Sequence, residues 1–160
     1  MEHRVKIIRS DRRRRTVQAA VVDGVIEVRI PAGLDAETEE RMVNGIVAKV
    51  RRKLSAGEVD LTDRAARIAR RFDLPVPDSI EWSDRQRTRW GSCTPGSRTI
   101  RISNRLAAAP DFVLDYVLVH ELAHLAVPDH GPAFRRLTDR YADAERAKGY
   151  LQALTNHGLA

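Results

Sequence analysis

The segment His120-Glu121-Leu122-Ala123-His124 constrains this chain more than any other feature of its sequence. Two histidines four residues apart lie on one face of a helix with Cβ atoms about 5–6 Å apart, so both imidazoles can reach one ion at about 2.0–2.1 Å. Glu121 points just off that face, where it can take a proton from a water held on the metal. The segment therefore predicts a metal site with a general base beside it. The alternative is a helix with two buried or solvated histidines that bind nothing.

The residues before this motif predict a buried central helix. Pro110 suits a first helical position and Asp111 suits the positive N-terminal end. The residues that follow are apolar nearly all round. The strongly polar exceptions are Asp115 and the motif itself, and burying a neutral polar group without a partner costs about 2–7 kcal/mol. We expect a metal to supply the partner.

A catalytic zinc normally has three protein ligands and one water, so a third ligand is needed. His130 is the preferred candidate, because Val127-Pro128-Asp129 is expected to end the helix and let the chain turn back, and Pro132 can open the next helix. His3 and His157 stand alone near the ends of the sequence and are expected to be solvated. The rival ligands are acidic residues on or near the next helix: Asp129, Asp139, Asp143 and Glu145.

The spacing of the three histidines equals the metzincin spacing, but Val127 occupies the place of the metzincin glycine. Met1 and Met42 both lie upstream, so a downstream Met-turn cannot form. The longer string HELAHLAVPDHGPAF, preceded by RTRWGSC at Arg87–Cys93 and by RRRRTVQAAVVDGVIEVRIPAG, instead resembles the YgjP-like metallopeptidases, small bacterial zinc-dependent proteins related to the SprT-type proteases. The likeness extends over residues 12–134.

This resemblance implies zinc as the cofactor and peptides or proteins as substrates. Glu121 matches the family's catalytic glutamate, and Gly131 and Phe134 match positions that shape and pack the turn after the last ligand. Trp90-Gly91-Ser92-Cys93 matches a family signature to which we assign no chemical role. The three metal ligands of the family correspond to His120, His124 and His130.

The fold class that we expect is α+β, a zincin-like single domain with an N-terminal antiparallel β ribbon and a central helix that carries the motif. With 160 residues, 42% of them hydrophobic, the chain is long enough for one core. The domain is predicted over 1–160, with a β-rich lobe at 1–33 and the metal-site core at 78–160. The first ten residues lack a signal-peptide pattern, no segment is apolar enough to span a membrane, and Cys93 is the single cysteine. We therefore expect a cytoplasmic protein without a membrane partner.

Hydrophobic periodicity and turn residues predict the individual elements. Strands are predicted at 5–8, 16–22, 25–30, 80–83, 87–93 and 99–103. Helices are predicted at 35–54, 61–72, from 110 to the motif, and from 132 onward. Asp23-Gly24 and Pro95-Gly96-Ser97 are turn signals, and Gly149 is expected to end the helix that starts at 132 before a short tail helix. Ser55 to Asp60 is the candidate flexible connection between two lobes.

Arginine supplies most of the positive charge of this chain, whose formal net charge is +6. Arg12 to Arg15 form a run, and alternating arginines at 85–89 would share one face of a strand. Such cations could follow the phosphates of a nucleic acid or hold an acidic substrate. We favour a solvated face, because charge alone says little about reaction. Trp82 and Trp90, which could stack on bases, are expected in the core.

Cys93 has three interpretations. As a fourth ligand it would close the site and make the metal structural, whereas as a small residue beside the site it would leave the water position open. The second is favoured, because structural zinc sites usually contain several cysteines and Glu121 would have no task in a closed site. A cysteine nucleophile is the least favoured, because metal-bound imidazoles cannot serve as its base.

The sequence therefore predicts a zinc metallopeptidase in which Glu121 deprotonates a water on the metal and passes the proton to the leaving amine. An exposed strand edge at 89–93 or 99–103 could bind an extended peptide. Two other classes stay open: a metal-dependent phosphohydrolase acting on nucleotides, and a basic nucleic-acid-binding protein with a structural zinc. The sequence favours no oligomeric state. It also favours none of four candidate oxyanion stabilisers: Arg89, Tyr116, Tyr141 and Tyr150.

Overall fold

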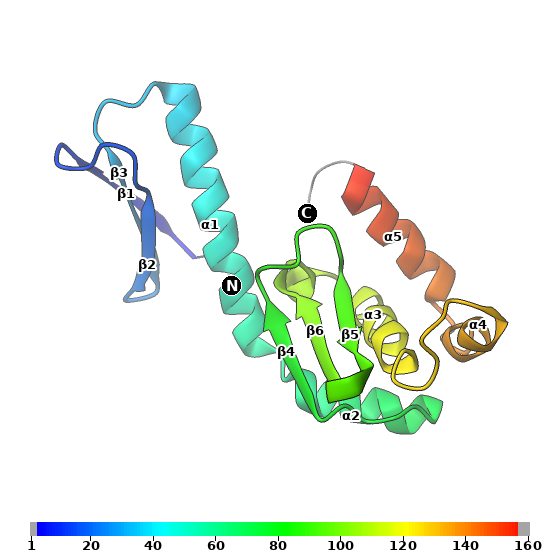
Figure 1. Cartoon of the computed structure of the whole chain (residues 1–160). Helices are drawn as coiled ribbons and strands as arrows, with labels where there is room; N and C mark the ends of the chain where they lie inside the picture. The colour runs from blue at the N-terminus through cyan, green and yellow to red at the C-terminus, as the bar shows by residue number, and fades with distance from the viewer. Residues whose placement is uncertain (1–2, 157–160) are drawn as a thin grey trace. The chain divides into compact units, whose positions relative to one another are not determined.

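The computed structural model describes residues 3–156 (Figure 1). Its internal contacts divide the chain into two compact units, with the boundary between Ser55 and Ala56. Helix α1 (Ala36–Glu58) continues across this boundary, so most of the predicted flexible connection is helical. The single domain predicted over 1–160 stays a prediction. Of the two isolated histidines, His3 is half-buried and His157 lies outside the described residues.

The first unit holds a three-stranded sheet in the order β1-β3-β2. Strands β2 (Gln18–Val22) and β3 (Val25–Pro31) form the predicted antiparallel hairpin, and Asp23 and Gly24 in its turn have φ of 49° and 76°. Strand β1 (Val5–Ser10) pairs parallel with β3, so the prediction of a wholly antiparallel ribbon is wrong. The loop after β1 reverses the chain into β2, and β3 then returns between the two strands.

The core of the first unit lies between this sheet and α1. Alternate residues of β3 point to one face, where Ile26, Val28 and Ile30 are fully buried against Val43 and Val47 of α1. The arginine run lies outside this core, in the loop between β1 and β2, and three of its four residues are exposed. This placement agrees with the solvated loop that we favoured.

The second unit contains a sheet in the order β4-β6-β5. Strand β4 (Ser79–Ser83) pairs parallel with β6 (Thr99–Ser103), and β5 (Gly91–Thr94) pairs antiparallel with β6. A short 3-10 helix at Pro95–Ser97 forms the predicted turn between β5 and β6. Because β6 occupies the centre, β5 is an edge strand.

The segment 84–90 is irregular, so the prediction of a strand from residue 87 is wrong and the alternating arginines do not share a strand face. Side-chain hydrogen bonds hold this loop in place of strand pairing. Gln86 Nε2 donates to Ser92 Oγ at 2.6 Å, and Ser103 Oγ donates to the carbonyl oxygen of Gln86 at 3.3 Å. Trp82 and Trp90 are half-buried and pack against the core rather than inside it.

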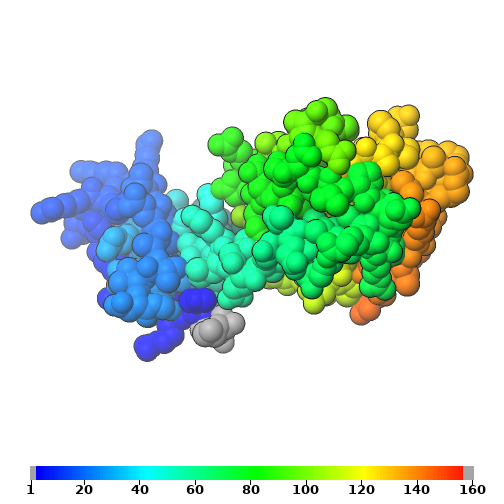
Figure 2. Space-filling model, turned by 90° about the horizontal axis from the view of Figure 1, so that it is seen from below, coloured from blue at the N-terminus to red at the C-terminus, as the bar shows by residue number. Residues whose placement is uncertain are grey.

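Helix α3 (Asp111–Ala123) is the centre of the second unit, as predicted. It is buried on nearly all sides and contacts β5, β6, α2 (Leu61–Phe72), α4 (Pro132–Thr138) and α5 (Ala144–Asn156). Figure 2 shows a face on which the side chains of α2 form a continuous surface with those of the second sheet. The fold is therefore α+β, with a central helix packed between a small mixed sheet and further helices.

The segment after residue 132 forms two helices that are separated at 139–143, so the predicted break at Gly149 is wrong. Helix α4 ends at Thr138, whose hydroxyl donates to the carbonyl oxygens of Phe134 and Arg135 at 3.4 and 3.3 Å. Such bonds back to the preceding turn compete with the helical pattern. Gly149 lies inside α5.

Asp115, a polar residue of the central helix, is paired with an arginine instead of a metal. Arg64 of α2 donates from Nε to Asp115 Oδ1 at 2.6 Å and from Nη2 to Asp111 Oδ1 at 2.9 Å. The side chains of Arg64 and Asp115 are only 16% and 29% exposed. This pair links α2 to the helix that carries the motif.

We predict that Arg64→Ala lowers the free energy of unfolding by about 1.5–3 kcal/mol, because it removes hydrogen bonds between charged groups and leaves Asp115 without its partner. Arg67→Ala is the matched control, since the Arg67–Asp63 pair on the same helix is more than 60% exposed and such pairs contribute about 0–1 kcal/mol. Urea denaturation measures both variants. Equal losses would show that the Arg64 pair contributes no more than a surface pair.

Candidate metal centre

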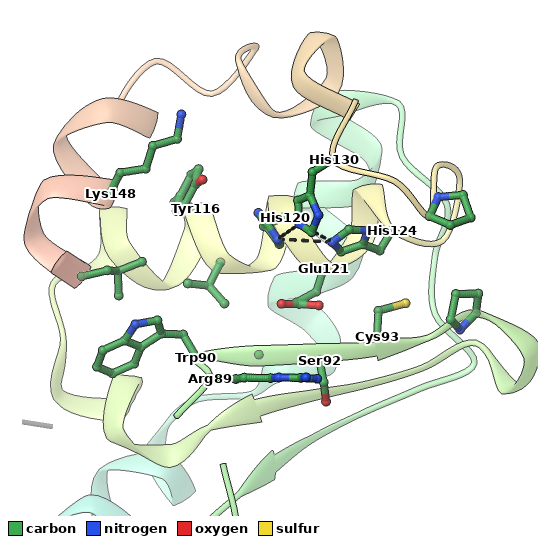
Figure 3. A pocket seen from close by; sticks show the side chains of 15 residues that line it. Arg89, Trp90, Ser92, Cys93, Tyr116, His120, Glu121, His124, His130 and Lys148 are labelled. Carbon is green, nitrogen blue, oxygen red and sulfur yellow. Dashed lines mark hydrogen bonds between the residues drawn. The ribbon is translucent and has the colours of Figure 1, made fainter. Parts of the chain in front are cut away.

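Three imidazoles converge at the C-terminal end of α3 (Figure 3). His120 lies in the last turn of α3, His124 caps its end, and His130 lies on the loop before α4. The Nε2 atom of His124 is 3.3 Å from that of His120 and 3.1 Å from that of His130, and the third Nε2 pair is 3.2 Å apart. Over residues 3–156 no other group of three or more potential metal-ligating side chains converges in this way. The acidic rivals and Cys93 are not part of the group.

The geometry of this triad fits a tetrahedral ion. Ligands at about 2.0–2.1 Å from a tetrahedral centre lie about 3.3–3.4 Å from one another, close to the spacing of the three Nε2 atoms.

The protonation states of the imidazoles also suit metal binding. The Nδ1 atom of His124 lies 3.2 Å from the carbonyl oxygen of Val127, so it carries the proton and leaves the Nε2 lone pair free. Burial, followed by the neighbouring His124 and His130, lowers the pKa of His120 to about 4, so this imidazole is neutral at pH 7.

Phe134 of α4 packs against all three imidazoles of the triad. Its ring centroid lies 4.8, 4.4 and 4.8 Å from those of His120, His124 and His130, and its side chain is 3% exposed. The resemblance implied this packing role.

Helix α3 ends at Ala123, before the predicted stop near Pro128, and the turn that follows brings His130 back over the helix end.

Glu121 lies between the triad and strand β5 (Figure 3). Its side chain is buried, and burial raises the pKa of its carboxyl group to about 7, against a smaller opposite effect of Arg89. A carboxyl group with a pKa near neutrality can both accept and return a proton under physiological conditions. The carboxyl group of Glu121 can therefore exchange a proton near neutral pH.

Gly91 gives Glu121 the room that it occupies. A Cβ atom at position 91 would lie 2.6 Å from Oε1, 2.8 Å from Cγ and 2.9 Å from Cδ of Glu121, distances that are shorter than van der Waals contact. The carboxylate thus packs directly against the backbone of β5. This contact gives a structural role to one residue of the Trp90-Gly91-Ser92-Cys93 signature, to which the sequence assigned none.

The triad and Glu121 open into a cavity of about 830 Å³. Cys93 lines it and is half-buried. Burial, with a smaller effect of Glu121, raises the pKa of its thiol to about 11, so the thiol stays protonated at neutral pH. Its sulfur is not among the converging ligand atoms of the triad. This placement agrees with the small residue beside the site that we favoured.

Sequence reasoning missed part of the cavity wall. Lys148 and Leu151 line it from α5, and no motif marks either of them. Among the candidate oxyanion stabilisers, Arg89 and Tyr116 line the cavity. The other two are turned to structural contacts: the Tyr141 hydroxyl donates to the carbonyl oxygen of Phe112, and the Tyr150 ring packs edge-on against the Phe112 ring.

Comparisons with known proteins define the class of this chain as a metallopeptidase. The family described as "YgjP-like, metallopeptidase domain" matches residues 49–154. A solved structure, that of the metallopeptidase zymogen of Methanocaldococcus jannaschii jannalysin, is similar with a TM-score of 0.51 and 18% sequence identity, over 64% of this chain and 99% of the other. A search among curated proteins finds no match.

The chain belongs to the YgjP-like metallopeptidase family, because the family match covers well over half of its length. This membership confirms the resemblance drawn from the motifs, and it implies a divalent metal. The solved relative shares the fold. Among the helices of residues 3–156, none is long and apolar enough to cross a membrane.

Proposed function

We propose that this protein is a zinc-dependent peptidase in which His120, His124 and His130 hold the metal and Glu121 is the general base. The observation that carries the proposal is the convergence of three Nε2 atoms at tetrahedral spacing, with a buried carboxyl group beside them. The metal at such a site, when bound, makes water more acidic and polarises the carbonyl group of a substrate.

The residues of the chain supply the proton transfers. The Glu121 carboxylate takes a proton from the attacking water as the oxygen forms its bond to the carbonyl carbon. The protonated carboxyl group then gives this proton to the amine nitrogen that leaves when the C–N bond breaks. The raised pKa of Glu121 suits both steps, and its packing against Gly91 fixes the carboxylate before the substrate arrives.

The edge strand β5 offers a place for the peptide backbone. Strand β5 pairs with β6 alone, and Gly91, Ser92 and Cys93 line the cavity beside the triad. An extended peptide can add to such an edge through main-chain hydrogen bonds. This would hold a scissile carbonyl next to the triad and Glu121.

A turnover screen tests the proposed function. We expect the zinc-loaded protein to cleave members of a mixed peptide library, with products identified by mass spectrometry, and to stop when a chelator removes the metal. Release of inorganic phosphate from nucleoside triphosphates is measured in parallel. Phosphate release without peptide cleavage would overturn the peptidase proposal in favour of the phosphohydrolase alternative.

We predict that Gly91→Ala lowers kcat severely while the zinc content stays unchanged. The added methyl group must displace the Glu121 carboxylate, and a misplacement of about 1 Å can cost about 10²-fold in rate. Gly96→Ala is the matched control, because a Cβ atom there meets nothing within 4 Å. Kinetics and metal analysis of both variants check the prediction. If Gly91→Ala had the same kcat as the control, the close contact between Gly91 and Glu121 would have no role in catalysis.

A further inference from the structure

The cavity extends beyond the triad toward the N-terminal part of α3, where its walls are apolar (Figure 3). Val117 comes from α3, Trp90 from the loop before β5, and Leu151 from α5. Tyr116 adds an aromatic ring one helical turn before His120, with the two ring centroids 6.2 Å apart. None of these side chains belongs to the triad or acts as the base. They form a separate compartment of the cavity beside the reacting groups.

Contacts from outside the cavity hold the Trp90 side of the compartment in place. The guanidinium carbon of Arg105 lies 4.1 Å from the centroid of the Trp90 ring, and Arg105 Nη2 donates to the carbonyl oxygen of Arg89 at 2.9 Å. The backbone N–H of Ser103 donates to the carbonyl oxygen of Trp90 at 2.9 Å. A wall that is fixed before binding avoids the entropic cost of ordering it around a ligand. The compartment is thus preformed.

The positively charged side chain of Lys148 lies at the edge of this compartment. The Nζ atom of Lys148 lies 6.0 Å from the centroid of the Tyr116 ring and 2.6 Å from a carboxylate oxygen of Glu145, which is itself 87% exposed. Lys148 lines the cavity from α5, so its positive charge lies near any group that enters. Like charges brought together in a partly desolvated site repel each other. A lysine or arginine side chain is therefore disfavoured there.

We propose that this compartment is a side-chain subsite of the peptidase that accepts large apolar residues and rejects basic ones. The proposal rests on the proposed function. The position of this subsite relative to the scissile bond depends on how the peptide pairs with β5, which runs from Gly91, next to Trp90, to Thr94, next to Pro95. A peptide that adds antiparallel to β5 runs toward Trp90. The subsite then holds the residue that follows the scissile bond.

Binding can be tested separately from turnover. The sequence has two tryptophans, so Trp82→Phe leaves Trp90 as the fluorescent reporter, and Glu121→Gln prevents hydrolysis. We titrate the zinc-loaded double variant with peptides that differ at one residue, which is Leu, Ala or Lys. We expect the Leu peptide to bind about 10-fold or more tightly than the Ala peptide, the scale of a few methylene groups in an apolar pocket, and the Lys peptide to bind worst. Equal affinities would overturn the proposal.

Two substitutions and a matched control identify the side chains that set the preference. In the same background, Leu151→Arg is expected to abolish the preference for Leu, while Gln152→Arg, at an exposed neighbouring position of α5, leaves it unchanged. Lys148→Glu replaces an exposed side chain and is expected to improve binding of the Lys peptide at least 10-fold, even if Leu151→Arg fails to fold. A Lys148→Glu variant that still rejects the Lys peptide would contradict the assigned role of the cation.

Cleavage by the protein with Glu121 intact then separates this proposal from the function on which it rests. Cleavage before large apolar residues supports both. Cleavage with no preference for the residue after the bond overturns the subsite and leaves the peptidase standing. Selective binding of the Leu peptide without any cleavage supports the subsite and overturns the peptidase.

Discussion

Glu121→Gln is expected to lower peptide turnover by a factor of about 10² or more, while zinc stays bound at full stoichiometry. Glutamine keeps the length and hydrogen-bonding capacity of the side chain, but its amide cannot accept the proton of the attacking water. The carboxyl group is buried beside the triad, and burial raises its pKa to about 7. Steady-state kinetics on a cleaved peptide, with zinc measured by mass spectrometry, checks both parts.

Glu81→Gln is a suitable control for this loss. It makes the same chemical change at an exposed carboxylate of β4, which pairs with Arg101 outside the cavity, and it leaves the triad and Glu121 untouched. We expect near-normal turnover. If Glu121→Gln retained normal turnover as well, another group would be the base and the proposed mechanism would be wrong.

His130→Ala is expected to weaken zinc binding by more than about 100-fold. Loss of a group that only hydrogen-bonds to a metal ligand costs up to about 100-fold in affinity, and loss of a ligand itself is expected to cost more. The substitution removes one of three converging nitrogen donors. His130 lies on an exposed loop, so the fold is expected to survive the change. Competition with a chromogenic chelator measures the affinity, and circular dichroism measures the fold.

Asp129→Ala serves as the neighbour control for the third ligand. Asp129 was a rival ligand on the same loop, and the structure does not place it in the converging group. Its substitution is expected to leave zinc affinity within a few-fold of the original protein. The opposite pattern, in which Asp129→Ala releases zinc and His130→Ala retains it, would transfer the third ligand role to the acid.

The elements that local sequence determines were predicted well. Helix α2 and strand β6 have the predicted bounds, and the hairpin turn at Asp23-Gly24 forms as expected. Turn residues and hydrophobic period act over a few neighbouring residues, so they can be read without the rest of the chain. The spacing of His120 and His124 likewise fixes two imidazoles on one helix face before any tertiary contact is known.

The errors occur where distant segments decide the structure. Strand β1 pairs parallel with β3 because β3 returns between β1 and β2, which no local pattern reveals. The loop at 84–90 alternates like a strand, but Gln86 and Ser103 hold it by side-chain hydrogen bonds. The role of Gly91 depends on Glu121, which lies on a different element. Contacts of this kind required the three-dimensional structure.

The most direct test of the account is the location of the metal in crystals of the zinc-loaded protein, determined by anomalous diffraction at the zinc edge. We predict one ion about 2.0–2.1 Å from the Nε2 atoms of His120, His124 and His130, with a fourth position that faces Glu121 and holds a solvent oxygen. An ion bound elsewhere would contradict the account. So would an ion whose fourth ligand is the Cys93 sulfur at about 2.3 Å, because a closed site of that kind leaves no place for a reacting water.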